Sequence, residues 1–294
     1  MYSNEIIKKM NSRLILGTVQ MGIDYGINNN LGKISSNEIF KILDEAYNNG
    51  IEILDTAEAY GSAMSEIGEF QNKSNKYFKI INKFNGDHIN LSDKLKTGIE
   101  ILNVKNYYGY LFHNISDLED SKNINELLKE KSNGRILKIG VSIYTNEEFE
   151  KAISIPEIDI IQFPFNLLDN SKKRLKLIQK AKSENKELHI RSIFLQGLIY
   201  KSIDDLPLKL LPLKPYLLKI KDIANRYNIT VNEMALQYAL SFDEIDYILI
   251  GVDSIEHLKN NLNFIKNKIS TELKEEISSI DVKEESLLYP MNWN

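Results

Sequence analysis

The chain has 294 residues, of which 43% are hydrophobic and 27% are charged, so it can bury a sizeable core and is not expected to be disordered. Its net charge of -4, with 37 basic residues scattered among 41 acidic ones, excludes a basic face for nucleic acid, and no run approaches the ~18 apolar residues of a membrane span. With no cysteine, no metal-binding spacing among its four histidines and no signal-like apolar N-terminus, it is expected to be a cytoplasmic protein without disulfides or a metal site.

Short apolar runs alternate with amphipathic segments along the whole chain. Eight runs are predicted as strands: "RLILGT" (13–18), "IEILDT" (51–56), "YFKIINKF" (77–84), "YYGYLFHN" (107–114), "ILKIGVSI" (136–143), "IDIIQFPF" (158–165), "ELHIRSIF" (187–194) and "IDYILIG" (245–251). Runs that are apolar at consecutive positions are typical of parallel strands covered by helices. Eight of them favour an α/β fold of the (β/α)8 TIM-barrel type over a doubly wound sheet, and no GxGxxG follows a strand. Because no linker divides the chain, residues 1–294 are predicted to form a single domain.

The connections between the strands are predicted to be helical, with one exception. The segment 36–50 shows helical spacing of apolar residues, with Ser36 or Asn37 expected to cap its start and Gly50 to end it. The exception is the connection at about 196–215, which is long and contains prolines. Loops of this length are more often functional than accidental, and in a barrel this one would cover the catalytic face, so it is predicted to be a lid.

Polar side chains are predicted at the carboxyl ends of three consecutive strands. Asp55, Lys83 and His113 end the second, third and fourth strands, and Tyr60 follows in the loop after Asp55. Each has a structural alternative: Asp55 as a turn former, Tyr60 as a packed ring, Lys83 as a solvated strand end and His113 as a core histidine. Since active sites of barrels lie at this end of the strands, their joint occurrence favours a catalytic site.

This set of side chains is suited to moving a proton. Tyrosine has an ordinary pKa near ~10, which is too high for ready proton exchange at neutral pH. A nearby Lys83 would lower the pKa of Tyr60, Asp55 would keep Lys83 charged, and a neutral His113 could donate a hydrogen bond to a substrate oxygen. The set contains neither a nucleophile nor a metal ligand. For a carbonyl substrate the missing partner is a hydride, which implies a nicotinamide cofactor.

The chain resembles the aldo-keto reductase superfamily over nearly its whole length. The motifs that carry the resemblance are "LGTVQMG", "GIEILDTAEAYG", "NKF", "GYLFHN", "KIGVSIYTNEEFEKAI", "IIQFPFNLLD", "RSIFLQGL" and "ILIGVDSIEHLKNNL". The resemblance implies a barrel that binds NADPH, less often NADH, in extended form and reduces an aldehyde or ketone to an alcohol. It also implies Tyr60 as proton donor, Lys83 and Asp55 as its tuning pair, and His113 as the residue that orients the carbonyl.

The resemblance further implies a set of cofactor-binding residues. Carried over position by position, it places Ser142 and Gln162 at the nicotinamide carboxamide, Ser192, Phe194 and Gln196 at the pyrophosphate, and Ser254, His257 and Asn261 at the adenosine, with Gly17, Thr18 and Gly251 in the first and last motifs. Arg191 stands where an aromatic ring often stacks on the nicotinamide. A planar guanidinium can stack there, and its charge should disfavour the cationic oxidised ring. Ile143 stands where many members have Asn, so one carboxamide hydrogen bond is expected to be missing.

The adenosine end departs from the pattern of NADPH-binding members, which often hold the 2′-phosphate with Lys or Arg. This chain has Gly251, Asp253 and His257 at those positions. Asp253 would repel a phosphate and could accept a ribose hydroxyl. Its structural alternative is to cap the helix predicted from residue 254. The sequence therefore predicts weak selectivity for NADPH, with use of NADH.

The substrate and its pocket are less defined by the sequence. Candidate pocket residues are Tyr25, Asn114, the lid and the tail at about 284–294, which carries the sole tryptophan, Trp293. Asp24, Asn28 and Asn114 favour a hydroxylated, sugar-like small molecule. Two other functions stay open: a non-catalytic, nucleotide-binding regulatory subunit of this fold, and a non-redox barrel lyase or isomerase. The oligomeric state, reaction direction and pathway are not predicted.

Overall fold

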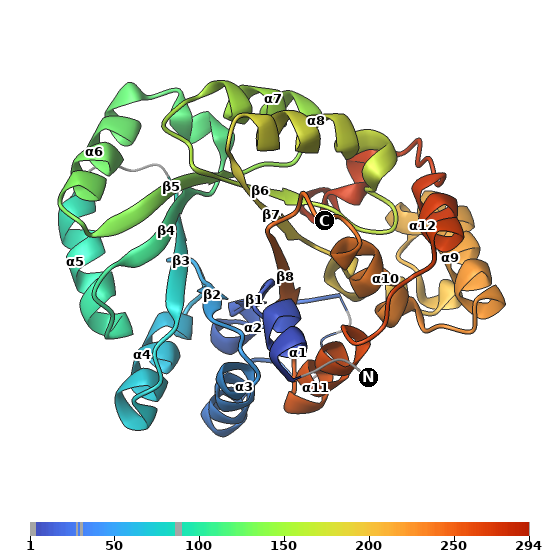
Figure 1. The fold of residues 1–294 in the computed structure, drawn as a ribbon, viewed down its shortest axis with the longest axis horizontal. Coiled ribbons are helices and arrows are strands. Elements are labelled where there is room, and N and C mark those ends of the chain that lie inside the picture. The colour runs from blue at the N-terminus through green and yellow to red at the C-terminus, as the bar shows by residue number, and fades with distance from the viewer. Residues whose placement is uncertain (1–3, 28, 30–31, 86–89, 294) are drawn as a thin grey trace.

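Eight parallel strands form a closed barrel in chain order, each paired with its neighbours in sequence and β8 paired with β1 (Figure 1). The computed structural model describes residues 4–27, 29, 32–85 and 90–293. The strands are β1 (Leu14–Gly17), β2 (Ile53–Asp55), β3 (Lys79–Phe84), β4 (Tyr107–Phe112), β5 (Ile136–Ser142), β6 (Ile160–Pro164), β7 (Glu187–Arg191) and β8 (Tyr247–Gly251). Each lies within one of the eight predicted runs, so the predicted (β/α)8 barrel is confirmed.

Helices surround this ring, and Figure 1 shows α3 to α8 on its outside. The α-helices are α1 (Asn4–Asn11), α2 (Val19–Gly22), α3 (Ser36–Asn48), α4 (Ala63–Ser74), α5 (Leu91–Leu102), α6 (Ser121–Ser132), α7 (Asn146–Ser154), α8 (Ser171–Ser183), α9 (Lys214–Arg226), α10 (Val231–Leu240), α11 (Ile255–Phe264) and α12 (Thr271–Ser278). Short 3-10 segments are η1 (Ile115–Leu118), η2 (Leu195–Tyr200), η3 (Ile203–Asp205), η4 (Leu208–Leu213), η5 (Glu285–Leu288) and η6 (Pro290–Asn292). No helix in the described part of the chain has the length and apolarity needed to cross a membrane.

Helix α3 forms where the local sequence predicts it, but its N-terminal cap differs from the predicted one. Four of its apolar positions are buried, as the spacing predicts, whereas Tyr47 is 40% exposed. The cap, however, is Ser35, whose side chain accepts a hydrogen bond from the backbone N–H of Glu38. The expectation of Ser36 or Asn37 is wrong because Ser35 is the last residue with extended backbone, at ψ 150°, and only a residue in that conformation can fold its hydroxyl onto the first turn.

The predicted lid has more structure than a plain loop. It contains most of η2, all of η3 and η4, and the first two residues of α9. Leu198, Leu210 and Leu213 are fully buried, so the segment is fastened to the core by apolar side chains. Leu208 is 85% exposed on its outer side. Movement of this segment as a lid stays a prediction.

The barrel interior is layered along its axis. Ile15, Ile53, Ile81, Leu111 and Ile160 form a separate buried cluster inside the ring of strands. The larger core cluster fills the space between the strands and the helices. An apolar middle layer therefore separates the two ends of the barrel, and polar side chains inside the ring are confined to those ends.

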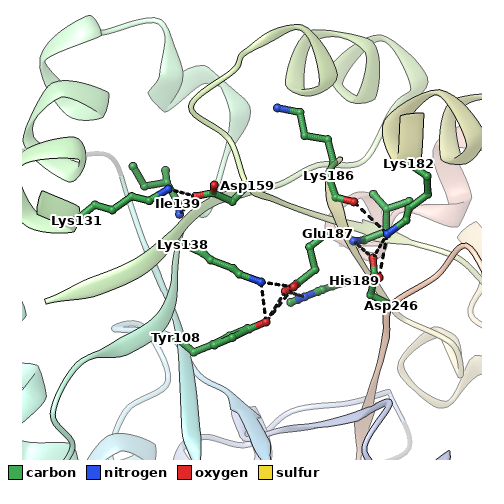
Figure 2. A network of polar contacts seen from close by, with 11 residues as sticks. Tyr108, Lys131, Lys138, Ile139, Asp159, Lys182, Lys186, Glu187, His189 and Asp246 are labelled. Atoms are coloured by element: carbon green, nitrogen blue, oxygen red, sulfur yellow. Dashed lines mark hydrogen bonds and ion pairs between the residues drawn. The ribbon is translucent and has the colours of Figure 1, made fainter. Parts of the chain in front are cut away.

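The amino-terminal end of the barrel is closed by a polar network centred on Glu187 (Figure 2). Tyr108 donates to both carboxylate oxygens at 3.0 and 2.9 Å, His189 Nε2 lies 2.8 Å from Oε1, and the Lys138 ammonium forms an ion pair with Oε2. His189 is fully buried and its ring packs edge-on against Tyr247. A role in stability is sufficient to explain this network, because residues at this end of a barrel serve stability rather than catalysis.

We expect Glu187→Gln to destabilise the fold in a pH-dependent way. Burial acts to raise the pKa of Glu187, but the hydrogen bond and charge of His189, followed by Lys138, lower it to about 2. A carboxylate whose pKa is depressed by folding stabilises above its unfolded pKa, and that stability is lost as the pH falls towards the folded value. The variant should lose about 2 to 3 kcal/mol of unfolding free energy in urea at pH 7 and much less near pH 2.

The matched control is Glu52→Gln, because Glu52 pairs with Lys79 at the surface, where both side chains are more than half exposed. Its effect should stay below about 0.5 kcal/mol at either pH. An equal loss for Glu187→Gln at both pH values would show that the carboxylate charge does not stabilise the barrel.

Candidate active site

A cavity of about 1260 Å³ lies at the carboxyl ends of the strands. It is lined by the predicted site residues Gly17, Thr18, Tyr25, Asp55, Tyr60, Lys83, His113, Ser142, Gln162, Arg191, Ser192, Phe194, Gln196, Gly251, Asp253, His257, Asn261 and Trp293. Two predicted residues, Asn114 and Ser254, do not line it. Residues from all eight strand ends or the loops after them are thus brought to one cavity.

A buried ion pair lies at the centre of this end of the barrel. The Lys83 ammonium contacts Asp55 Oδ1, and each side chain is only 3% exposed. The other carboxylate oxygen, Oδ2, accepts a hydrogen bond of 2.9 Å from Gln162 Nε2. Both oxygens of Asp55 are therefore bound. A buried pair is tolerated when its remaining hydrogen-bonding capacity is met in this way.

Tyr60 lies over this pair, with the Lys83 ammonium 5.4 Å from its ring centroid. Burial raises the pKa of Tyr60, and the positive charge of Lys83 lowers it without overcoming burial and the negative charge of Asp55. The expectation that Lys83 brings this pKa below its ordinary value is therefore wrong in its net direction. The reason is that the same cavity that gathers the charges also excludes water from the phenol. At neutral pH Tyr60 keeps its proton.

Lys83 itself stays charged. Burial alone would lower its pKa, but the charge of Asp55 and the hydrogen bond to it prevail and raise it above the ordinary lysine value. His113, in contrast, is neutral. Burial and then the positive charges of Lys83 and Arg191 lower its pKa to about 4, against the opposing effect of Asp55. A neutral imidazole and a protonated phenol place two hydrogen-bond donors in the lining of the same cavity.

The loop that carries Tyr60 is tied to the neighbouring strands. The backbone N–H of Glu58 donates to the carbonyl of Lys83 at 3.1 Å, and its carboxylate accepts 2.6 Å from the Tyr110 hydroxyl on β4. Gly22 of α2 touches the loop so closely that a Cβ atom there would lie 1.6 Å from the Tyr60 carbonyl oxygen. Glu58 and Gly22 were not predicted as site residues, because their roles depend on contacts with other elements.

The residues predicted to hold a carboxamide fit that group. Gln162 Oε1 is buried and has no hydrogen-bond partner among the described residues, while its Nε2 is bound to Asp55. An acceptor left open in this way costs stability unless a ligand supplies a donor. Ser142, at the end of β5, lies next to Gln162 in the register of β5 and β6 and is 4% exposed. An amide N–H₂ would satisfy Gln162, so the donor set matches a nicotinamide carboxamide.

The guanidinium of Arg191, which was predicted to stack on the nicotinamide, already has two partners within the protein. One face of it lies 4.2 Å from the ring of Tyr144, and its Nη2 donates to the Ile143 carbonyl at 3.1 Å. The Tyr144 ring in turn packs edge-on against Tyr289 of the tail. Tyr144 was not predicted as a site residue. It lies within the strand-five motif, but only the fold shows that it contacts Arg191 of β7.

The predicted pyrophosphate segment holds strained backbone. Ser192, Leu195 and Gln196 have φ of 60°, 47° and 52°, in the region that favours glycine. The strain directs Gln196 towards the loop after β1, where its Nε2 donates to the Tyr25 hydroxyl at 2.7 Å and its carbonyl accepts from Ile27 at 3.2 Å. Because β1 and β7 both pair with β8, this link crosses the carboxyl end of β8.

At the predicted adenosine end, Ser254 and Asp253 have different roles at the start of α11. Ser254 caps α11 by accepting from the backbone N–H of His257, so Asp253 is not the cap. Since the Ser254 hydroxyl is used in this way and does not line the cavity, its predicted contact with adenosine is not supported. Asp253 lines the cavity instead, with Oδ2 at 3.9 Å from His257 Nδ1.

The substrate-pocket predictions divide in the same way. Tyr25 lines the cavity, and so does Trp293, whose indole N–H donates to the Leu287 carbonyl at 2.8 Å within the tail. Asn114, just before η1, and Asp24 are both exposed, and neither lines the cavity. Asn28 lies outside the described residues.

Two further features bear on the chemistry of the cavity. Gln20, which lies within the first-strand motif, lines the cavity beside Gly251, and its buried Oε1 has no partner among the described residues. Its position in the motif would have been a usable signal. Within residues 4–27, 29, 32–85 and 90–293, no group of three or more histidine, aspartate or glutamate side chains is placed to hold a metal ion.

Comparison with known proteins agrees with this geometry. The profile of the Aldo/keto reductase family matches residues 13–282. Among solved structures, the chain is similar to the aldo-keto reductase AKR11C1 from Bacillus halodurans in its holo form, with 18% identity, 92% of each chain covered and a TM-score of 0.74. It is also similar to the glycerol dehydrogenase AKR11B4 from Gluconobacter oxydans, with 16% identity, coverage of 91% and 90%, and a TM-score of 0.71. At these identities the structures show the fold alone. Comparison with curated proteins found no match.

The electrostatics of the site predict a change in the titration of His113. Removing the Lys83 ammonium in Lys83→Met takes away one of the charges that lower the pKa of His113 and leaves Asp55 unpaired. The pKa should rise from about 4 towards the ordinary histidine value of ~6.5, as followed by NMR of the imidazole nitrogens. Lys79→Met, at a half-exposed lysine outside the cavity, should leave it unchanged. An unchanged pKa in Lys83→Met would contradict the assigned coupling.

Proposed function

The chain belongs to the aldo/keto reductase family, and on that premise we propose that it is an NAD(P)H-dependent oxidoreductase that reduces an aldehyde or ketone to an alcohol. The observation that carries the proposal is the buried Lys83 and Asp55 pair beneath Tyr60, with neutral His113 beside it, in a cavity that extends to Asp253. Membership of the family supports an oxidoreductase acting on carbonyl compounds. The cofactor and the role of each side chain are part of the proposal.

A bound nicotinamide would supply the hydride. The residues of the chain would do the rest. His113, neutral because of burial and neighbouring charges, would donate an N–H to the carbonyl oxygen and orient it. Tyr60 would give its hydroxyl proton to that oxygen as negative charge grows on it. The phenolate left on Tyr60 would be stabilised by the Lys83 ammonium, which Asp55 keeps charged and in place.

Several observations support a dinucleotide as the cofactor. Gln162 Oε1 needs a donor, and a carboxamide would provide one. The cavity runs from this point past Gln196 to Asp253 and His257, which suits a long ligand bound in extended form. Asp253 is the acidic group at the far end, and an acidic side chain there favours a free ribose hydroxyl over a 2′-phosphate. NADH use is therefore part of the proposal.

We expect Tyr60→Phe to abolish turnover while keeping cofactor binding. The phenol supplies the proton, so its loss should lower kcat by about 10³-fold for any carbonyl substrate. The sole tryptophan, Trp293, lines the cavity, so its fluorescence can report binding of NADH or NADPH. Tyr77→Phe, at a tyrosine that is 51% exposed, is the matched control and should behave as the wild type.

These measurements also separate the alternatives. Binding of neither nucleotide would point to a non-redox barrel enzyme, and binding without turnover of any carbonyl by the wild type would point to a regulatory subunit. Turnover in Tyr60→Phe near the normal rate would refute Tyr60 as the proton donor.

A second prediction concerns the choice of nucleotide. Because Asp253 would repel a 2′-phosphate, the wild type should prefer NADPH over NADH in kcat/KM by less than about a hundredfold. Asp253→Ser should raise the NADPH to NADH ratio by about tenfold or more, whereas Asp222→Ser, at an exposed aspartate on α9, should not change it. A native NADPH preference above this limit, or an unchanged ratio in Asp253→Ser, would contradict the role of Asp253.

A further inference from the structure

We infer that the substrate carries an oxyanion group, a carboxylate or a phosphate, close to its carbonyl, and that Arg191 and Tyr25 bind this group. The inference rests on the proposed function and names the class of substrate for the same cavity. It follows from the balance of charges, donors and acceptors at the reaction end, which is the part of the cavity around Tyr60, Lys83 and His113.

The charges at the reaction end do not balance. Lys83 and Arg191 are the lysine and arginine side chains that line the described cavity, and Asp55 and Asp253 are the acidic ones. Asp55 is paired with Lys83. Asp253 lies with His257 at the other end, and its charge is not among those that act on Tyr60, Lys83 or His113. Arg191 does act on all three, so it is close to them and adds a positive charge there.

Arg191 has no acidic partner of its own. Among the described residues, no carboxylate lies within ion-pair distance of its guanidinium, whereas the buried Arg174 is paired with Asp169 at 2.7 Å. The partners of Arg191 are neutral oxygens: the Ile143 carbonyl and the Ser192 hydroxyl at 3.3 Å. A half-buried cation beside a cavity, with no counter-charge of its own, is stabilised when an anion from a ligand joins it.

The guanidinium is also held in a fixed orientation. One face is stacked on Tyr144, and two of its five N–H groups are used by Ile143 and Ser192. A guanidinium binds rings through its faces and oxyanions through its edge. Contact of its free face with a cofactor ring, as the family resemblance suggests, therefore leaves edge N–H groups for an oxyanion.

Tyr25 supplies a second donor. Its hydroxyl accepts from Gln196 Nε2 at 2.7 Å, so its own hydrogen is free to point elsewhere. Burial, followed by the proximity of Tyr60, raises the pKa of Tyr25 to about 12, while Arg191 acts against this, so the phenol stays protonated and lies near both groups. Tyr25 and Arg191 therefore bring two donors to the same part of the cavity as the proposed proton donor.

Negatively charged acceptors are scarce at this end. Asp55 is the one carboxylate there among the described residues, and both of its oxygens are bound, by Lys83 and Gln162. A ligand group that only accepts hydrogen bonds and carries negative charge fits such a surface, whereas a neutral alkyl group would leave Arg191 unpaired. Carboxylate and phosphate oxygens share this chemistry.

The test compares matched pairs of substrates. Butanal is paired with 4-oxobutanoate, and D-glyceraldehyde with D-glyceraldehyde 3-phosphate, using whichever nucleotide the wild type accepts. We expect kcat/KM for the charged member of at least one pair to exceed that of the neutral member by tenfold or more. In Arg191→Gln this charged-to-neutral ratio should fall to about one, with partial rescue in Arg191→Lys, since lysine restores the charge without the fork. Tyr25→Phe should lower the ratio by a smaller factor.

Ratios are used because a change in cofactor affinity affects both members of a pair equally. Arg226→Gln, at an exposed arginine paired with Glu276 outside the cavity, is the matched control and should leave every ratio unchanged. Equal kcat/KM for both members of each pair in the wild type, or an equal fall for both members in Arg191→Gln, would overturn the inference while leaving the proposed function intact. Failure to reduce any of the four aldehydes would count against the proposed function itself.

Discussion

Lys83 and Asp55 form a buried ion pair on which the other features of the site depend. Burying two opposite charges is tolerated only when their remaining hydrogen-bonding groups also find partners. For Asp55 the second partner is Gln162, which donates a hydrogen bond to its other carboxylate oxygen. The pair in turn sets its surroundings. The positive charge of Lys83 helps to keep His113 neutral, and it lies next to the ring where Tyr60 would become a phenolate. Loss of either partner would leave an unpaired charge at the centre of the barrel.

The layering of the barrel explains why this pair can exist. Apolar side chains fill the middle of the ring, which separates the Glu187 network at one end from the Lys83 and Asp55 pair, which lines the cavity at the carboxyl ends of the strands. Backbone strain is also placed there. Non-glycine residues with positive φ in the segment after β7 cost about 1 to 3 kcal/mol each, and here they direct Gln196 to Tyr25.

Much of the fold and the centre of the site was predictable from local patterns. The eight strands lie in continuous apolar runs, and the second, third and fourth of these runs end in the polar residues Asp55, Lys83 and His113. What failed was decided by geometry between elements. Ser254 and Asn114 do not line the cavity, although the residues directly before them, Asp253 and His113, do. Whether a side chain lines the cavity can change from one residue to the next, and a pattern of residue types does not show this.

The sequence by itself determined the barrel and the chemical identity of the groups at its mouth. Apolar runs that alternate with amphipathic segments, and the polar residues that end those runs, can be identified from the local order of residues alone. The tertiary structure alone decided how those groups affect one another. Burial outweighs the charge of Lys83 at Tyr60, Tyr144 takes one face of Arg191, and Arg191 is left without a carboxylate partner among the described residues. These outcomes depend on solvent exclusion and on distances between residues far apart in the chain, and neither quantity is encoded in any short stretch of sequence.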